Sequence, residues 1–301
     1  MSNYLISIVG PTAIGKTTLS IKLAKHFDTE IISADSRQFY KEMQIGTAAP
    51  SLEELSQAKH HFIHHKSVDD NYNAGNFEKD ALELLDNLFK KHAVVIMVGG
   101  SGLYIDAVTK GLDEFPEVHS SIREKLNKEL IKNGLTSLQN KLKELDEVSY
   151  HKISIENPHR VIRALEICLS SDKPYSYYLD RPKTERNFKT ISIGLSADRN
   201  IIYDRINKRV DLMMQEGLLN EVETLKGKKK LNTLNTVGYK ELFKYLNNEC
   251  DLDFAISEIK KNTRRFAKRQ ITWFKKDESM RWFDQQYELK EITDYIKKKS
   301  S

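Results

Sequence analysis

The sequence has very few cysteines and no long apolar stretch. Its 301 residues contain only two cysteines, Cys168 and Cys250, both inside helical patterns. We interpret them as buried free thiols in a reducing cytoplasm. No segment approaches the roughly 18 apolar residues of a membrane span, and the opening residues MSNYLISIVG lack the basic start and cleavage site of a secretory signal. We therefore expect a cytoplasmic protein with no membrane partner.

One long segment has no acidic residue. From Ile259 to Lys276 the sequence IKKNTRRFAKRQITWFKK carries eight Lys and Arg, although the whole chain has a net charge of only +5. At helical spacing the apolar residues fall on one face, and the basic residues Lys261, Arg264, Arg265, Lys268 and Lys275 fall on the opposite face. An unbroken basic face is typical of proteins that bind a polyanion, most often nucleic acid, with a merely solvated helix face as the alternative.

The sequence also has no internal repeat and no low-complexity linker. Residues 1–112 alternate short apolar runs, such as LISIV and AVVIMVGG, with helical patterns, which favours a parallel sheet covered on both faces. Residues 113–186 are helical, charged and free of strand-like runs, so we expect a helical insertion domain. The run TISIGL at Thr190–Leu195 returns the chain to the sheet, and residues 187–301 complete the core with basic C-terminal helices. The predicted fold is α/β, a P-loop NTPase-like parallel sheet flanked by helices.

The most specific local motif is GPTAIGKT, which fits the pattern G-x-x-x-x-G-K-[ST]. It follows the apolar run Leu5–Val9 and precedes a helical pattern, the context that a phosphate-binding loop requires. Backbone N–H groups in such a loop converge on anionic oxygens, Lys16 adds a positive charge, and the Thr17 hydroxyl can ligate Mg²⁺. We predict a di- or triphosphate site with Mg²⁺ as cofactor, formed by Gly10, Pro11, Thr12, Ala13, Ile14, Gly15, Lys16 and Thr17.

A single aspartate stands where a general base is expected. Motor and switch NTPases place an aspartate at the end of a core strand to hold magnesium, but the run VVIMVGGSGLY ends in glycines. Asp35, in IISADSRQFY, instead follows the second strand, near the switch point where α/β proteins bind ligands. A carboxylate beside the phosphates suits general-base work on an acceptor nucleophile. Capping of the next helix together with Ser36 is the alternative, and kinases of small metabolites share this arrangement.

Several segments between Ile8 and Phe274 together resemble the bacterial tRNA dimethylallyltransferases, which are isopentenyltransferases of the adenosine beside the anticodon. Two positions depart from the family pattern: Ala49 stands where a lysine is usual, and His64 where an aspartate is usual. Neither is a residue to which we assign chemistry. The matching segments, in order, are GPTAIGKT, ISADSRQFYKEMQIGTAAPS, HHFIHH followed by YNAGNFEKDA, VGGSGLY, NPHRVIRALEI, NTVGYKEL and TRRFAKRQITWF.

The resemblance implies a prenyl transfer. The phosphate loop would hold the diphosphate of dimethylallyl diphosphate, and the dimethylallyl group would move to N6 of adenosine 37 in tRNA. Lys16, with magnesium on Thr17, would stand where charge grows on the departing diphosphate, and Asp35 would accept the amine proton. The implied partners are dimethylallyl diphosphate and the tRNA anticodon stem-loop, bound by a monomer.

The resemblance also implies a set of RNA-binding residues. Asp35, Ser36, Arg37 and Gln38 would line the acceptor base, with Ser101 beside it. The insertion and the C-terminal helices would contact the rest of the stem-loop. The residues expected there are Arg123, His159, Arg160, Val161, Ile162, Arg163, Thr236, Val237, Gly238, Tyr239, Lys240, Glu241, Thr263, Arg264, Arg265, Phe266, Ala267, Lys268, Arg269 and Gln270.

Other functions remain open from the residues alone. A small-molecule kinase would use the same loop and Asp35, although the acid-free basic helix and the lack of an obvious arginine-rich lid argue against it. An RNA-binding ATPase or scaffold would bind RNA and leave it unmodified. His60, His61, His64 and His65 suggest a zinc site, but no cysteine or carboxylate accompanies them at a metal-site spacing, so we expect a loop packed near the substrate channel.

The basic segment generates the first testable prediction. Replacing Arg264 and Lys268 together with alanine should weaken binding of an anticodon stem-loop. If both side chains contact phosphates, the slope of log K against log salt should flatten by about two units. Fluorescence anisotropy across a salt series measures both quantities. An unchanged slope would mean that the helix face is only solvated.

Overall fold

The computed structural model describes residues 2–300. The chain divides into two compact units, one made of the residues up to Lys110 and from Arg186 onward, the other of Gly111–Glu185. The predicted insertion, residues 113–186, differs from the second unit by two residues at its start and one at its end. None of the helices in residues 2–300 combines the length and hydrophobicity that a membrane crossing needs.

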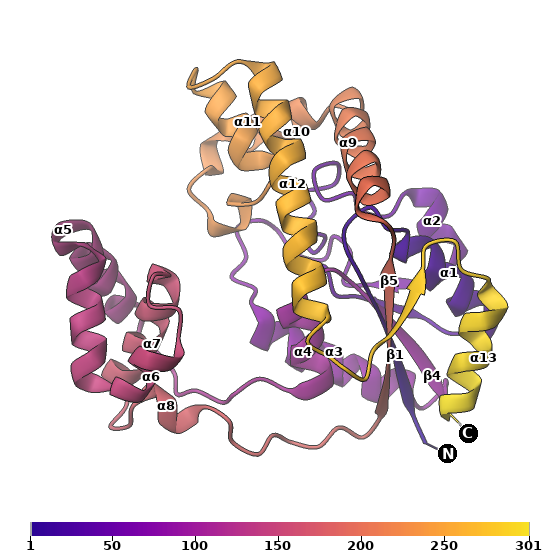
Figure 1. Ribbon diagram of the computed structural model, residues 1–301, viewed down its shortest axis with the longest axis horizontal. Helices are drawn as coiled ribbons and strands as arrows, with labels where there is room; N and C mark the ends of the chain where they lie inside the picture. Colours follow the sequence, from indigo (N-terminus) through magenta and orange to yellow (C-terminus); the bar gives the residue numbers. More distant parts are fainter. Residues whose placement is uncertain (1, 301) are drawn as a thin grey trace. The chain divides into compact units, whose positions relative to one another are not determined.

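The first unit is built on one six-stranded sheet, in which every neighbouring pair of strands is parallel (Figure 1). The strand order is β3-β2-β4-β1-β5-β6, which brings the ends of β2, β4 and β1 side by side. The predicted α/β class is therefore confirmed. The strands are β1 (Tyr4–Val9), β2 (Ile31–Ser33), β3 (His60–His61), β4 (Val94–Val98), β5 (Lys189–Ser196) and β6 (Arg281–Asp284).

Helices cover both faces of the sheet because its strands carry apolar side chains on both faces. Successive side chains of a strand point to opposite faces, so Leu5 and Val9 of β1 enter one hydrophobic core while Ile6 and Ile8 enter the other. The flanking helices are α1 (Lys16–Phe27), α2 (Leu52–Gln57), α3 (Ala74–Leu88), α4 (Gly102–Lys110), α9 (Arg199–Gln215), α10 (Leu218–Thr224), α11 (Tyr239–Leu246), α12 (Leu252–Phe274) and α13 (Leu289–Ser300).

Helices are the only regular secondary structure among the described residues of the second unit. It contains α5 (Ser120–Leu145), α6 (Glu147–Lys152), α7 (Pro158–Ser170) and α8 (Tyr175–Tyr178). Gly134, at φ 77°, breaks α5 into two helical stretches. The core of this unit contains Val161 and Ile162, which had been expected to contact RNA. That expectation is wrong in this structure, because both side chains are buried.

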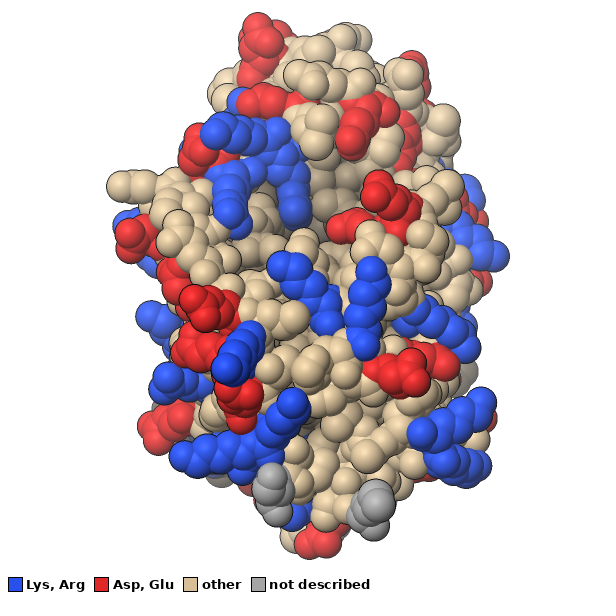
Figure 2. All heavy atoms as spheres, turned by 90° about the vertical axis from the view of Figure 1, so that its right-hand side faces the viewer, with Lys and Arg blue, Asp and Glu red and all other residues tan. Residues whose placement is uncertain are grey.

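Charges of both signs are mixed on the face of the molecule that carries α1 and α13. Figure 2 shows Lys and Arg interspersed there with Asp and Glu, with no broad field of one sign. A mixed surface of this kind is typical of a solvated face, not of a phosphate-binding one.

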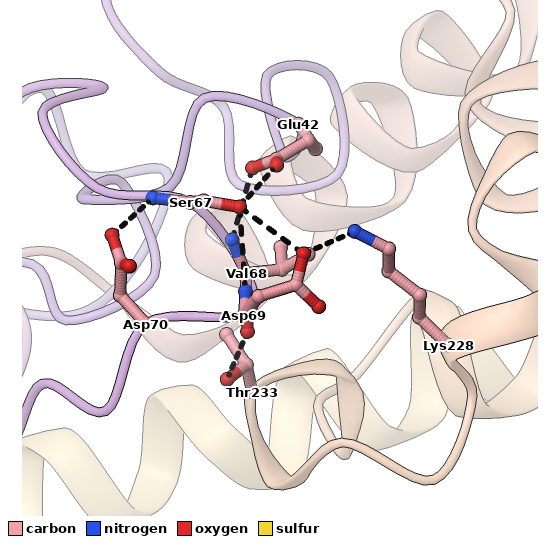
Figure 3. A network of polar contacts seen from close by, with 7 residues as sticks. All are labelled: Glu42, Ser67, Val68, Asp69, Asp70, Lys228 and Thr233. Carbon is pink, nitrogen blue, oxygen red and sulfur yellow. Dashed lines mark hydrogen bonds and ion pairs between the residues drawn. The ribbon is translucent and has the colours of Figure 1, made fainter.

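A network of hydrogen bonds and an ion pair connects loops of the first unit (Figure 3). Glu42 accepts hydrogen bonds from the Ser67 hydroxyl at 2.7 Å and from the Val68 N–H at 3.0 Å. Burial alone would raise the pKa of Glu42, but these hydrogen bonds lower it below its usual range. Thr233 donates to the Val68 carbonyl at 3.3 Å, and Lys228 forms an ion pair with Asp69. The network thus joins the loop after β3 to the segment between α10 and α11.

A second anchor is the carboxylate of Glu221 on α10. It accepts the backbone N–H groups of Gln44, Ile45 and Gly46 at 2.8–3.0 Å and the Tyr239 hydroxyl at 2.6 Å. A Cβ at Gly46 would lie 2.5 Å from the Tyr239 ring, so only glycine fits there. Glu221 therefore fixes the loop that begins the IGTAAP segment.

This anchor generates a stability prediction. Glu221→Ala leaves three backbone donors and one buried hydroxyl without their acceptor, so the free energy of unfolding should fall by about 3 kcal/mol. Denaturant titration followed by circular dichroism measures the change. Glu223→Ala, at an exposed position of the same helix, is the matched control. Equal stability of the two variants would contradict the anchoring role.

Candidate functional site

The site forms where three parallel strands end together. The phosphate loop follows β1, Asp35 follows β2 after one residue, and the turn Gly99–Ser101 follows β4. Because β2, β4 and β1 are neighbours, these three segments meet at one edge of the sheet. Gly99 permits the close approach, since a Cβ there would lie 2.4 Å from the Ala34 carbonyl oxygen.

The phosphate loop has the backbone geometry of an anion cradle. Gly10 and Gly15 have φ values of 148° and 101°, and Ala13 also has a positive φ of 65°. A Cβ on Gly10 would lie 2.6 Å from the Leu195 carbonyl oxygen, so a side chain there would collide with β5. The loop leads into the N-terminus of α1, where backbone N–H groups and the helix dipole favour negative charge.

Lys16 is held inside this loop. Its Nζ donates to the carbonyl oxygens of Gly10 at 3.1 Å and Pro11 at 2.9 Å. Burial lowers the pKa of Lys16 to about 8, with Asp35 raising it and Arg209 lowering it further. The lysine is therefore poised to lose its charge slightly above neutral pH while no anion is bound.

Asp35 is oriented by its own turn. Its Oδ1 accepts the Arg37 N–H at 3.1 Å, which fixes the carboxylate relative to the backbone. The adjacent Ser36 is tied to Ser101, whose hydroxyl accepts the Ser36 N–H at 3.0 Å and lies 3.1 Å from the Ser36 hydroxyl. Arg37 in turn donates to the Thr233 carbonyl at 2.7 Å. The turn after β2 is thus braced by the turn after β4 and by the network of Figure 3.

Two cavities meet at these residues. The phosphate-loop cavity has a volume of about 530 Å³ and is lined by Thr12–Thr18 together with Gln38, His60 and His64. The aromatic cavity has a volume of about 560 Å³ and is walled by Tyr104, Phe266 and Trp273. The residues that line both are Thr12, Lys16, Asp35, Thr47, Ala48, Arg209 and Met213. A charged ligand in one cavity and a flat ligand in the other would therefore meet beside Lys16 and Asp35.

Many residues expected to bind RNA lie in the aromatic cavity, although they come from distant parts of the sequence. Ser36, Arg37 and Ser101 line it from the strand ends. The remaining members come from the segment before α11 and from α11 and α12. They are Thr236, Val237, Gly238, Lys240, Thr263, Phe266, Arg269 and Gln270.

Gln270 has a different role from the expected contact with the RNA backbone. Its side chain is buried, accepts the Thr12 N–H at 2.9 Å and donates to the Gly100 carbonyl at 2.9 Å. Both ends of the amide are therefore committed within the protein. Gln270 ties the phosphate loop to the turn after β4 from α12.

Gln38, which was expected to line the acceptor base, also forms its hydrogen bonds within the protein. Its amide donates to the carbonyls of Thr47 and Ala48 at 3.2 and 3.1 Å and accepts from the Ser33 hydroxyl at 3.4 Å. It lines the phosphate-loop cavity, not the aromatic cavity where Ser36 and Arg37 lie. Its visible role is to hold the loop that carries Thr47 and Ala48.

Three further expected RNA contacts are buried in the core of the first unit. Tyr239 and Ala267 are almost fully buried, and Glu241 is buried where it accepts the Gly238 N–H and the Asn262 amide. These three side chains cannot touch RNA in this structure. The hydrogen bond between Glu241 and Asn262 joins α11 to α12.

The other expected contacts lie outside both cavities. Arg264 donates to the Asn207 amide oxygen at 2.7 Å, Arg265 to that of Asn262 at 3.3 Å, and Lys268 is exposed. In the helical unit, Arg123 and Arg163 both pair with the buried carboxylate of Glu166. His159 is exposed and Arg160 contacts Ser154 at 3.3 Å. Their proposed roles in RNA binding stay predictions.

Two arginines of the site were missed from the sequence. Arg205 and Arg209 on α9 donate to the Ile14 carbonyl and the Thr12 hydroxyl, each at 3.4 Å. Their spacing of four residues puts them on one face of the helix, which is the only signal that the sequence offers. Which face α9 turns toward the phosphate loop depends on packing between distant segments.

The four histidines do not converge. His60 contacts the Ala58 carbonyl at 2.8 Å, His61 contacts Glu30 at 2.5 Å, and His64 lines the phosphate-loop cavity. His65 packs against aromatic rings, and burial lowers its pKa to about 4. No group of three His, Cys, Asp or Glu side chains that could hold a metal is found within residues 2–300.

Magnesium is a better fit to the oxygen donors of the site than zinc. Thr17 and Asp35 line the phosphate-loop cavity, where they offer one hydroxyl and one carboxylate. Mg²⁺ is usually held by one or two carboxylates together with waters and ligand phosphates, and it does not need a full protein cage. The donor set therefore fits an Mg²⁺ ion carried mainly by a bound diphosphate.

Comparison with known proteins agrees with this geometry. Residues 38–277 match the family model described as IPP transferase. The chain belongs to the IPP transferase family. It is 61% identical over 299 residues to a tRNA dimethylallyltransferase of Christiangramia forsetii, with 99% of each chain covered. It is also 57% identical to a relative of the same name from Flavobacterium johnsoniae, with 97% of each chain covered.

Solved structures of this IPP transferase family share the fold. A tRNA isopentenylpyrophosphate transferase from Bacillus halodurans aligns with a TM-score of 0.74 at 35% identity and covers 99% of this chain and 97% of its own. A eukaryotic dimethylallyltransferase, described in its title as acting on tRNA, aligns with a TM-score of 0.79 at 26% identity and covers 94% of this chain and 74% of its own. The resemblance seen in the sequence is thus confirmed.

The buried lysine generates a pH prediction. Because the pKa of Lys16 lies at about 8, the ligand-free protein loses this positive charge as the pH rises through that value. A diphosphate ester is fully ionised above about pH 7, so its own charge does not compensate. Its affinity should be about tenfold weaker at about pH 9 than at about pH 7. Titration calorimetry in the presence of magnesium measures this ratio.

Lys16→Met is the control for this measurement. The variant should bind the diphosphate more weakly at every pH, and its affinity should change little across the same range. A tenfold fall that persists in the variant would assign the titration to another group.

Proposed function

We propose that this protein transfers a dimethylallyl group from dimethylallyl diphosphate to N6 of adenosine 37 in a tRNA anticodon loop. The products are diphosphate and N6-dimethylallyladenosine. The observation that carries the proposal is the pair of cavities that share Lys16, Asp35 and Arg209. One cavity contains an anion cradle, and the other has aromatic walls and room for a purine.

The phosphate-loop cavity accounts for the donor half of the reaction. The allylic carbon–oxygen bond breaks and its electron pair stays on the diphosphate oxygen. Lys16, the loop N–H groups and the N-terminus of α1 lie where that charge develops, and Arg209 adds a second cation nearby. Thr17 would hold Mg²⁺ together with the diphosphate, and the ion would supply further stabilisation of the leaving group.

Asp35 accounts for the acceptor half. The exocyclic amine of adenine is a weak nucleophile because its lone pair is delocalised into the ring. As its nitrogen forms the new bond to carbon, the amine loses a proton, which the Asp35 carboxylate accepts. The Arg37 N–H binds Oδ1, which leaves the second oxygen of Asp35 to accept the proton. The linked hydroxyls of Ser36 and Ser101 are placed to hydrogen-bond the base beside it.

Much of the rate would come from holding the two reactants in contact. Transfer needs the amine nitrogen and the allylic carbon nearly touching, and the shared wall of the two cavities offers one place for this. The adenosine has to leave its stack to enter, at a cost of roughly a few kcal/mol, which is lower in a loop than in a duplex. The proposal includes a monomeric enzyme, and a tRNA substrate supports the expected cytoplasmic location.

The proposal is tested by mass spectrometry of the RNA. An anticodon stem-loop with adenosine at position 37 is incubated with the protein, magnesium and either dimethylallyl diphosphate or ATP. We expect the mass of one five-carbon prenyl unit to be added only with the prenyl donor. ATP consumption without prenylation would instead favour a kinase or an RNA-dependent ATPase.

A variant of the general base Asp35 makes this test more specific. Asp35→Asn keeps the oxygen that accepts the Arg37 N–H but cannot take up the amine proton, so kcat should fall by about 10²- to 10⁴-fold. The affinity for the stem-loop should change little, because a general base acts chiefly in the transition state. Single-turnover kinetics and anisotropy measure the two quantities. Asp294→Asn, at an exposed position of α13, is the control, and an equal rate in both variants would remove Asp35 from the mechanism.

A further inference from the structure

Three large apolar side chains that are exposed to solvent converge at the aromatic cavity. Leu103, Phe266 and Trp273 are 48%, 38% and 38% exposed, and all three line that cavity. We call them the aromatic rim. Single exposed apolar residues are common on proteins, but several gathered around one cavity mark a surface that a partner covers.

The rim is built by two helices that pack tightly. Phe266 and Trp273 are two turns apart on α12, and Leu103 stands in the first turn of α4. A Cβ on Gly102 would lie 2.4 Å from the Trp273 indole, so the glycine admits the ring against α4. The three side chains are therefore neighbours because of the fold and not through their order in the sequence.

Trp273 is held in a fixed orientation. Its Nε1–H donates to Asp106 at 2.8 Å, and the other oxygen of Asp106 pairs with Lys110 at 2.9 Å. This arrangement makes Asp106 a positioning residue for the indole. A large ring that is both exposed and fixed loses little entropy when a flat ligand stacks on it.

Cations accompany the rings. The Arg269 guanidinium lies 5.7 Å from the Phe266 ring centre, and the Lys276 ammonium lies 5.5 Å from the Trp273 ring centre. Lys240 lines the same cavity from α11. Aromatic rings interleaved with Lys and Arg are the composition that binds unstacked nucleobases and the phosphates between them.

We infer that the aromatic rim stacks against the bases next to the acceptor adenosine, at positions 36 and 38 of the anticodon loop. This inference rests on the proposed function. When adenosine 37 is extruded toward Asp35 inside the cavity, its two neighbours lose a stacking partner at the cavity mouth, where the rim is exposed. Stacking on the rim replaces that partner and offsets part of the cost of extrusion.

The two tryptophans of the chain give a direct readout. Trp273 belongs to the rim, whereas Trp282 packs against Gly194 in the first unit. In Trp282→Phe protein all tryptophan emission comes from Trp273. We expect an anticodon stem-loop to quench this emission strongly. The same stem-loop with abasic residues at positions 36 and 38 should quench it much less.

Affinity gives a second, independent readout. Trp273→Ala and Phe266→Ala should each weaken stem-loop binding by roughly 5- to 150-fold, the range expected for loss of one base–aromatic stack. The slope of log K against log salt should stay unchanged, because no phosphate contact is lost. Phe254→Ala is the matched control, because Phe254 is a 54% exposed aromatic residue on the same helix that does not line the cavity.

A more conservative variant covers the case in which Trp273→Ala fails to fold. Trp273→Phe keeps an aromatic face but loses the hydrogen bond to Asp106. Trp273→Phe should bind the stem-loop more weakly than the wild type does. It should bind more tightly than the double variant that combines Phe266→Ala with Trp273→Phe.

Three outcomes would overturn the inference. The first is equal quenching by the intact and abasic stem-loops, and the second is an affinity of the rim variants equal to that of Phe254→Ala. The third is a change in salt slope, which would assign the rim to phosphate contacts. Prenylation by the wild type is measured in parallel. If the wild type modifies adenosine 37 while the rim variants behave as the control, only this inference fails; if it modifies no stem-loop, the proposed function fails.

Discussion

The arrangement of the site depends on the buried amide of Gln270. Its two hydrogen bonds join the phosphate loop, at Thr12, to the turn after β4, at Gly100, and both are made from α12. Position 100 has no room for a side chain, because a Cβ there would lie 2.2 Å from the Gln270 nitrogen. Removing a buried, hydrogen-bonded amide costs far more free energy than the net energy of its hydrogen bonds, because each partner is then left buried and unpaired. Gln270 therefore connects the two halves of the site to each other and to α12.

The helix that carries Gln270, α12, contributes to the core, to the cavity and to the solvent-exposed surface. The helical period turns Ala267, Gln270 and Phe274 inward, Phe266 and Trp273 toward the cavity, and Arg265 and Lys268 toward solvent. The acid-free segment that first drew attention to RNA is thus only partly a solvent-facing surface. Its buried members set the geometry of the phosphate loop, and its aromatic members form the mouth of a cavity.

The parts of the site that the sequence predicted are those with local causes. Gly10, Gly15 and Lys16 are recognisable because a cradle of backbone N–H groups needs particular residues at fixed spacing. Asp35 is recognisable because it stands at the end of an apolar run, where α/β proteins place ligands. The strand and helix alternation likewise carries the fold class in its periodicity.

The parts that the sequence did not predict depend on contacts between distant segments. Helical spacing puts Gln270 on the same face as Ala267 and Phe274, but it does not show that the amide binds Thr12 and Gly100, because those partners follow from the packing of α12 against the strand ends. Arg209 lies among other charged residues of α9 and is selected only by the position of the phosphate loop. Tyr239 and Glu241 belong to a recognisable motif, yet they are buried, because a segment can be characteristic of a family through packing as well as through contact with a ligand.

The contact between Gly102 and Trp273 restricts which substitutions this chain can accept. The indole occupies the space in which any side chain at position 102 would have to stand. A chain that replaces the glycine must at the same step accept a smaller residue at 273, and a chain that loses the tryptophan is freed from the need for glycine. The two positions are far apart in the sequence, but the residue at one limits which residue the other can hold.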